Sequence, residues 1–340
     1  MPRIAIDAMG GDHAPGVVVR GAYKSATEHA DWPHILVGDE AAVRRELEAC
    51  GAPLPNISVV HAPEAVGMHE HAVEALRSKK QSSIAISVGM VKQGHADAVL
   101  SAGNTGAFVA SATLGLRLLP GVKRAGILTT LPTLRGRIVI MDVGANVEAK
   151  PLHLMQYAVM ADKFYRSVIH DGKACKVGLI SVGSEEGKGN ALTKETHALL
   201  QQCELDFKGN VEGHEIYEGQ CEIVVCDGMV GNIILKMSEG LSEILIKMFV
   251  GHATRNGLAD EPRFKATVGD MIKAVDWREV GGAALLGVNG VVVIAHGRSD
   301  ERAIISGIRT AAFCCDSKMN EKIVDALKLE NSKAGAATEA

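Results

Sequence analysis

The sequence contains few aromatic residues and carries little net charge. Aromatic residues make up 4% of the 340 residues, and 36 Lys and Arg nearly balance 40 Asp and Glu. Nucleic-acid-binding proteins usually show a basic surplus or a basic stripe, and aromatic side chains are the usual platforms for unpaired bases. We therefore expect no nucleic-acid partner.

Cysteines are few and show no pairing pattern. Their number, seven, is odd, and no CxxC spacing occurs in this long chain. Disulfide frameworks are typical of short secreted proteins. The N-terminus, MPRIAIDAMGGD, also has no apolar run of the signal-peptide kind. We expect a reduced, cytoplasmic protein.

Apolar runs of the length that crosses a membrane, about 20 residues, are missing as well. Residues 98–116 and 280–297 lack charge, but glycines and polar residues such as Asn104 and His296 interrupt both stretches. We interpret each as a strand–loop–helix unit inside a soluble core.

Several catalytic signatures are absent. The first predicted strand is not followed by GxGxxG, so dinucleotide binding of the usual kind is disfavoured. There is no P-loop, HExxH or GxSxG motif. His69 and His71 are two residues apart and would not share a helix face. We expect neither a metal nor an organic cofactor.

Short Val- and Ile-rich runs alternate with helical stretches along the chain. The expected strands are residues 4–7, 35–37, 57–60, 98–101, 126–129, 138–142, 177–181, 222–226 and 291–295. Several are apolar throughout, which is typical of strands covered on both faces. The pattern predicts a three-layer α/β/α, doubly wound fold with a mostly parallel sheet. We expect one catalytic domain over residues 1–328 and a disordered tail over residues 329–340.

One segment, residues 232–276, is predicted to form a protruding helical hairpin. Its first helix repeats apolar residues at intervals of three and four, and a second amphipathic stretch begins at Pro262. The repeating positions are Ile234, Met237, Leu241, Ile244 and Met248. Three roles stay open: packing on its own domain, a dimer arm, which the heptad-like spacing suits, or contact with a membrane surface.

Glycine is abundant, and asparagine often follows it. Among 37 glycines, Gly-Asn pairs occur at 103–104, 189–190, 209–210 and 231–232. Most of these turns follow a predicted strand, where doubly wound sheets bind ligands. An amide side chain beside exposed backbone N–H groups suits a phosphate or a developing oxyanion. The alternative for each single asparagine is a helix cap or a left-handed turn.

The turn 101–106 lies between an apolar strand and a helix and is the leading candidate for holding phosphate. A helix N-terminus offers open N–H groups, and its dipole favours an anion by about 0.3–1 kcal/mol. Lys188 lies between two glycines in the turn 183–190, where an electrostatic role is favoured over packing.

Six segments together resemble the bacterial phosphate acyltransferase family of phospholipid synthesis (PlsX family). They are IAIDAMGGDHAP, ADAVLSAGNTGA, MDVGANVEAKP, EEGKGN, VVCDGMVGNIILKMSEG and GGAALLGVNGVVVIAHG. The resemblance implies a phosphotransacetylase- and isocitrate-dehydrogenase-like fold. It also implies a reaction in which a long-chain acyl group moves from acyl carrier protein to inorganic phosphate. Further implications are a cytosolic homodimer, contact with the inner membrane surface, a downstream glycerol-3-phosphate acyltransferase and no cofactor.

The residues suit this chemistry. Phosphate is already a nucleophile and a thiolate leaves readily, so the enzyme mainly positions phosphate and stabilises the oxyanion. We assign catalytic roles to Lys188, Asn232, Asn146 and Asp12. The candidate residues for binding phosphate and thioester are Gly10, Gly11, His13, Ser101, Gly103, Asn104, Thr105, Gly106, Glu185, Asn190, Asp227, Lys236, Asn289 and His296.

Other readings stay open. They are a short-chain acyl transferase acting on coenzyme A thioesters, a non-catalytic protein that binds the carrier or anions, and a dehydrogenase of similar fold. Basic residues near the hairpin, among them Lys236, Lys247 and Lys265, are candidates for contacting an acidic carrier protein.

Overall fold

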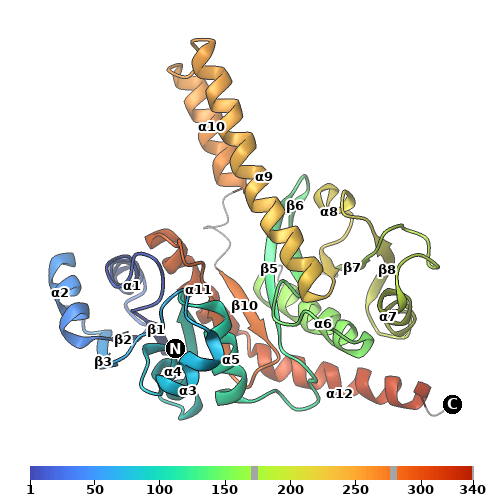
Figure 1. Ribbon diagram of the computed structural model, residues 1–340, viewed down its shortest axis with the longest axis horizontal. Coiled ribbons are helices and arrows are strands. Elements are labelled where there is room, and N and C mark those ends of the chain that lie inside the picture. Colours follow the sequence, from blue (N-terminus) through green and yellow to red (C-terminus); the bar gives the residue numbers. More distant parts are fainter. Residues whose placement is uncertain (170–174, 276–281, 339–340) are drawn as a thin grey trace.

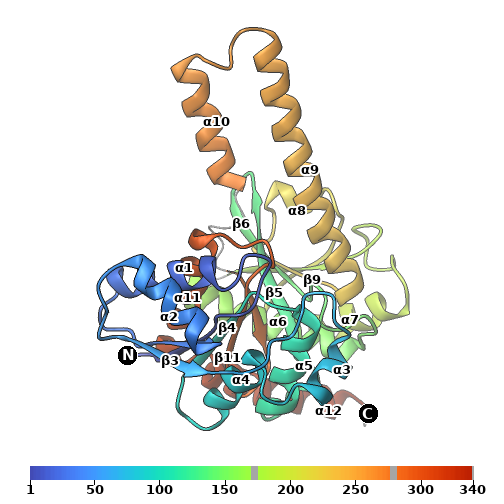
Figure 2. The same cartoon turned by 60° about the vertical axis from the view of Figure 1, so that its left-hand side comes forward.

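A computed structural model describes residues 1–169, 175–275 and 282–338. An eleven-stranded sheet runs through the molecule in the order β3-β2-β1-β4-β11-β10-β5-β6-β9-β7-β8, with helices on both faces (Figure 1 and Figure 2). The predicted α/β class with a mostly parallel sheet is confirmed.

The strands are short and mostly buried. They are β1 (Ile4–Asp7), β2 (His34–Gly38), β3 (Ile57–His61), β4 (Ala98–Ser101), β5 (Gly126–Thr133), β6 (Gly136–Met141), β7 (Lys176–Ile180), β8 (Asp206–Val211), β9 (Ile223–Val225), β10 (Ala283–Leu286) and β11 (Val291–Ile294). All residues of β1, β4 and β9 are buried. This is why their sequences are apolar without alternation.

The helices connect and cover these strands. They are α1 (Gly16–Glu28), α2 (Glu40–Cys50), α3 (Ala72–Ser78), α4 (Ser83–Lys92), α5 (Thr105–Leu116), α6 (Pro151–Phe164) with a π-helical turn (Tyr165–Ile169), α7 (Ala191–Gln201), α8 (Glu215–Glu218), α9 (Gly228–Arg255), α10 (Pro262–Val275), α11 (Glu301–Asp316) and α12 (Met319–Thr338).

The sheet reverses direction near its middle. Strand β10 is antiparallel to both β11 and β5, and β5 is antiparallel to β6. One half of the sheet, made of β6, β9, β7 and β8, therefore runs opposite to the other half, made of β3, β2, β1, β4 and β11. The two halves are also offset along the strand direction, because Val293 pairs with Ala284, Ala284 with Leu128 and Leu128 with Met141. The carboxyl ends of β11 and β6 therefore lie at the same level of the sheet.

Two layers of apolar packing cover the sheet. On one face, alternate strand residues such as Val99 and Ile127 pack with α4 and α5, with α9 at the margin. On the other face, Ile6 and Leu100 pack with α1 and α11, and Leu128 packs with α6 and α12. The first face carries the helices that frame the cavities described below.

The helices α9 and α10 form the predicted hairpin, which projects from the body of the molecule (Figure 1). The rings of Phe249 and Phe264 lie 5.5 Å apart and join the two helices. The expected boundary at residue 276 lies outside the described residues.

Two sequence-based expectations need correction. The stretch 280–297 was expected as a strand–loop–helix unit, but its described part forms the antiparallel pair β10 and β11. The expected disordered tail is helical as far as Thr338. Asn331 holds it in place, because its amide group donates to Gly121 O and accepts from Gln156 Nε2.

Candidate functional site

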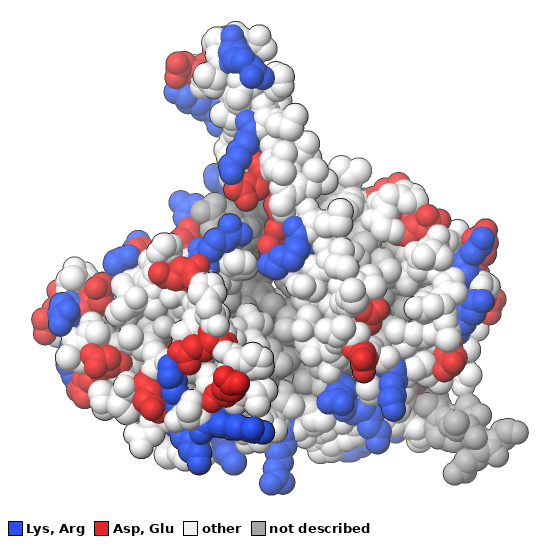
Figure 3. Space-filling view, viewed as in Figure 1, with Lys and Arg blue, Asp and Glu red and all other residues white. Residues whose placement is uncertain are grey.

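A cavity of about 580 Å³, here called the upper cleft, lies between α9 and the sheet. Its floor is β5, from which Ile127 and residues 129–132 line the cavity. The part of α9 between Asn232 and Ile246 forms one wall, and the segment 294–299 at the end of β11 forms the other. Figure 3 shows the molecule hollowed below the base of the hairpin. One end of the cleft is charged, and the floor is largely apolar.

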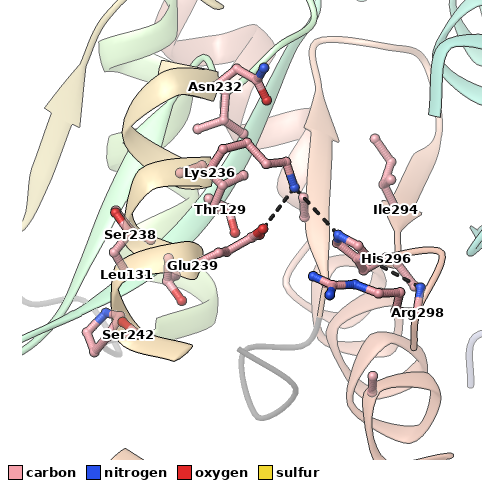
Figure 4. A pocket seen from close by; sticks show the side chains of 18 of the residues that line it. Thr129, Leu131, Asn232, Lys236, Ser238, Glu239, Ser242, Ile294, His296 and Arg298 are labelled. Carbon is pink, nitrogen blue, oxygen red and sulfur yellow. Dashed lines mark hydrogen bonds and ion pairs between the residues drawn. The ribbon is translucent and has the colours of Figure 1, made fainter. Parts of the chain in front are cut away.

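Four charged or ionisable side chains line the polar end of the upper cleft. Lys236 Nζ lies 2.9 Å from Glu239 Oε2 and 3.5 Å from His296 Nε2. Figure 4 shows Lys236 between these two side chains, with Arg298 beside the imidazole ring and Asn232 one turn away on α9. Of the predicted site residues, Thr105, Asn232, Lys236 and His296 therefore line one cavity.

The hydrogen bonds of His296 define its tautomer. The backbone N–H of Arg298 donates to Nδ1 over 3.1 Å, a closer contact than the 3.5 Å between Nε2 and Lys236 Nζ, so we assign the proton of the neutral ring to Nε2. Burial lowers the pKa of His296, and the positive charges of Lys236 and Arg298 lower it further, against opposing effects of Glu239 and Asp12. Near neutral pH, Nε2–H and the Lys236 ammonium group are two neighbouring donors, which suits an anionic oxygen.

The helix α5 begins at the middle of the cleft. Asn104 caps this helix by accepting from Ala107 N, and its amide nitrogen donates to the carbonyl groups of Met68 and Glu70. Its side chain thus serves as the cap that sequence reasoning left open as an alternative. The N–H groups of Thr105 and Gly106, in the first helical turn, lack partners within the helix and remain suited to an anion.

The loop after β1 supports the segment at 296–297. Asp12 N donates to Gly297 O over 2.8 Å. A Cβ atom on Gly10 would lie 2.6 Å from Gly103 N, and Gly11 has a φ of +112° against the same segment. The predicted residues Gly10, Gly11 and Asp12 therefore shape the loop that carries His296. His13 is exposed in the turn before α1.

Ser101 and Gly103 belong to a buried network beneath this loop. Ser101 Oγ donates to Asp7 Oδ2 over 2.6 Å and accepts from Gly103 N. Burial raises the pKa of Asp7, against the effect of these hydrogen bonds. The network joins the ends of β1 and β4.

The first turn of α9 packs directly on the loop after β6. Asp227 caps the helix by accepting from Met229 N and Val230 N. A Cβ on Gly231 would lie 1.9 Å from Asp142 O, so a side chain does not fit there. The carboxylate of Asp142 accepts hydrogen bonds from four backbone N–H groups, those of Ile127, Gly144, Ala145 and Asn146. This close packing fixes where Asn232 enters the cleft.

A second cavity, here called the lower groove, continues from the upper cleft. Its volume is about 600 Å³, and Thr105 lines both cavities. It runs between α5 and the segments 124–125 and 144–146. Asn146 lines it, but its amide nitrogen donates to Ala125 O and Tyr157 Oη, so the side chain mainly holds the groove wall together.

The remaining predicted site residues lie outside both cavities. Lys188 and Glu185 are exposed on the loop after β7, and Asn190 caps α7 by accepting from Thr193 N. Asn289 lies in the turn between β10 and β11, where its N–H donates to Arg117 O. The phosphate-binding roles of Lys188 and Asn190 stay predictions.

Sequence reasoning did not select Glu239, Arg298 or Arg124, although all three line a cavity. Glu239 follows Lys236 by three residues and so shares its helix face. Arg298 follows His296 by two residues. The spacing from Lys236 and His296 could therefore have pointed to Glu239 and Arg298. No such spacing in the sequence points to Arg124.

The cysteines offer no activated nucleophile. None of the seven, all of which lie in the described segments, forms a disulfide, and burial raises the pKa of Cys226 well above its ordinary value. Among the described residues, no three His, Cys, Asp or Glu side chains are grouped so that they could hold a metal ion.

None of the helices within residues 1–169, 175–275 and 282–338 combines the length and the apolar character that crossing a bilayer requires.

Proteins of similar sequence identify the family of this chain. The family described as "Fatty acid synthesis protein" matches residues 2–322. The phosphate acyltransferase of Desulforamulus reducens is 46% identical over 98% of this chain and 99% of its own. The enzyme of the same name from Geobacter sulfurreducens is 42% identical over 96% and 95%.

Two solved structures share the fold. A phosphotransacetylase from Streptococcus pyogenes matches with a TM-score of 0.64 at 20% identity, over 93% of this chain and 94% of its own. A branched-chain phosphotransacylase from Enterococcus faecalis matches with a TM-score of 0.55 at 15% identity, over 92% and 99%. The chain therefore belongs to the fatty acid synthesis protein family, in which its curated relatives are phosphate acyltransferases.

Proposed function

We propose that this chain transfers a long-chain acyl group from acyl carrier protein to inorganic phosphate. The observation that carries the proposal is the upper cleft, in which Lys236 and the Nε2–H of His296 lie at one end of a largely apolar cavity. An anion held there is next to a space that accepts an acyl chain.

The chemistry needs no covalent enzyme intermediate. A phosphate oxygen attacks the thioester carbonyl, the C–S bond breaks, and the products are acyl phosphate and the carrier thiol. Lys236, His296 and the open N–H groups at the start of α5 hold the phosphate. Asn232 donates to the carbonyl oxygen as negative charge develops there, and such a donor is typically worth ~2.7–4 kcal/mol of barrier.

The test is release of free thiol from a long-chain acyl carrier protein, with and without phosphate, while hydroxylamine traps acyl phosphate. We expect release that depends on phosphate and yields trapped product. Release without phosphate would indicate a thioesterase. Binding without turnover would indicate a non-catalytic protein, and faster reaction with short-chain coenzyme A thioesters would favour the second candidate enzyme.

We propose that the chain acts as a homodimer through α9. Met237, Leu241, Ile244 and Met248 are 69%, 58%, 56% and 55% exposed and lie along one stripe of this helix. Their spacing of three and four residues is that of paired helices. Light scattering should give twice the chain mass, and changing Leu241 and Met248 together to Glu should halve it. Val73→Glu on α3 is the control, because Val73 is also exposed and apolar.

Contact with the inner membrane surface is the second use proposed for the hairpin. At the hairpin tip Leu258 is 43% exposed, among mainly polar neighbours. Flotation with anionic vesicles at low salt tests it, and failure to float would exclude it. Cysteines that form no disulfide support a cytoplasmic location.

A further inference from the structure

The two cavities meet at the start of α5. Thr105 lines both, while the rest of α5 borders the lower groove alone. The reacting thioester at this junction would need two exits, one for its acyl chain and one for its thiol side. The upper cleft is the apolar exit toward the hairpin, and the lower groove leads the opposite way.

The dimensions of the lower groove suit a thin, extended ligand. Its α5 wall runs from Thr105 past Val109 and Thr113 to Leu114, which is ~14 Å at 1.5 Å per residue. A phosphopantetheine arm has thirteen bonds from phosphorus to sulfur. At backbone-like bond lengths it spans about 15 Å. The alternating apolar and hydroxyl side chains of the wall match the methylene and amide groups of such an arm.

The far end of the groove is positively charged. Arg124 lines it, and Lys123 and Lys150 are also exposed. No carboxylate lies within ion-pair distance of these three cations in the described part of the chain. Arg124 and Lys150 also lower the pKa of the neighbouring His153, after the effect of its burial.

The hairpin lysines contrast with this cluster. Lys247 and Lys265 lie in ion pairs with Glu243 and Asp260, which offset part of their charge, while Arg255 and Arg263 are also exposed on the hairpin. Positive charge at the mouth of a groove attracts and orients an anionic partner. The groove mouth is therefore a place where an acidic carrier can dock.

We propose that the lower groove takes the phosphopantetheine arm of the acyl carrier protein, with its phosphodiester at Arg124 and its thioester at Thr105. The inference rests on the proposed function and adds the path by which the carrier delivers its acyl group. The acyl chain then continues past Thr105 into the upper cleft.

Two variants test the path from different sides. Ala110 lines the groove, so Ala110→Trp fills it, and Arg124→Glu reverses the charge at its mouth. Arg45→Glu on α2 makes the same charge change at an exposed site away from the groove. Each is assayed with a long-chain acyl carrier protein and with the same acyl group on N-acetylcysteamine, which keeps only the last atoms of the arm.

We expect both groove variants to lower kcat/KM for the acyl carrier protein at least tenfold while changing it less than threefold for the short thioester. The control should change neither. Equal losses with both substrates, or no loss with the carrier, would overturn the inference. If Ala110→Trp fails to fold, the surface change Arg124→Glu decides. Wild-type protein that releases no thiol in response to phosphate would instead refute the proposed function.

Discussion

The role of Lys236 depends on charge at a defined place. Its ammonium group lies between Glu239 and His296 at the polar end of the upper cleft. We expect Lys236→Ala to raise the KM for phosphate about 10- to 100-fold, because a hydrogen bond to a charged group is worth ~1.5–3 kcal/mol. Steady-state kinetics with phosphate varied at saturating acyl carrier protein measures this.

The matched control is Lys247→Ala on the same helix. Lys247 also pairs with a glutamate, Glu243, but does not line the cleft. It should leave the phosphate KM unchanged. Equal effects of the two substitutions would remove Lys236 from the phosphate site.

Protonation of the His296 imidazole should make the reaction rate fall on the acidic side of its pH–rate profile. Burial, Lys236 and Arg298 hold its pKa below the ordinary value of 6.5, so the ring is neutral at pH 7. Protonation puts a hydrogen on Nδ1, which then opposes the Arg298 N–H. The rate with phosphate should therefore fall as the pH drops below about 6.5, and His296→Gln should remove that limb. The ionisation of phosphate itself affects both proteins equally.

The same pKa shift carries a stability consequence. A histidine whose pKa is lower in the folded state binds more protons when unfolded, so its contribution is complete above 6.5 and is lost as the pH falls from 6.5 through the lower folded-state pKa. Urea titrations of the wild type and His296→Gln at pH 5.5 and 7.5 check this. A wild type that loses no more stability in acid than the variant would contradict the assignment.

At the scale of the element, replacing two glycines of α9 by alanine should change the stability in opposite directions. A Cβ on Gly231 would lie 1.9 Å from Asp142 O, whereas nothing lies within 4 Å of one on Gly240. Gly231→Ala should cost at least ~1–3 kcal/mol, because backbone must move. Gly240→Ala should gain ~0.5–1 kcal/mol, because glycine weakens a helix interior. Thermal unfolding measures both, and equal shifts would refute the packing of α9 on this loop.

Elements with a strong periodic or apolar signal could be predicted from the sequence. The strands β1 and β4 and the helix α9 are examples, because burial or amphipathic spacing defines them locally. The strand β10 was missed although its hairpin with β11 is local, because its sequence, Ala-Ala-Leu-Leu, is short and made of residues that favour helices over strands. The helix at 329–338 was missed because the contacts of Asn331 with Gly121 and Gln156 are long-range.

Contacts between distant parts of the chain also limited how much of the candidate site could be predicted. Thr105, Asn232, Lys236 and His296 were selected from their loops or helix face, and the fold brings them to one cavity. Lys188 was selected because it lies between two glycines in a turn after a predicted strand. That strand, β7, lies beyond β9 in the sheet, and Lys188 lines neither cavity. For Asn104 and Asn190, the sequence could not distinguish a ligand from a cap.

At the scale of the whole molecule, the cleft joins the two oppositely running halves of the sheet. Thr105 and His296 come from the half that contains β4 and β11, while Asn232 and Lys236 follow β9 in the other half. A ligand that contacts both halves should therefore stabilise the folded chain as a unit. Phosphate at 100 times its Kd should add ~2.7 kcal/mol, which raises the Tm by roughly 4 °C for a chain of this length.

Phosphate also stabilises proteins non-specifically by exclusion from their surfaces. The specific part of the Tm shift is therefore measured by comparing the wild type with Lys236→Ala. The variant lacks one contact from the second half and should lose most of the specific shift, while Lys247→Ala keeps it. Chloride at matched ionic strength gives the baseline for each protein. If phosphate raised the Tm of all three proteins equally, the anion would not bridge the halves, and the site would have to be sought on one half alone.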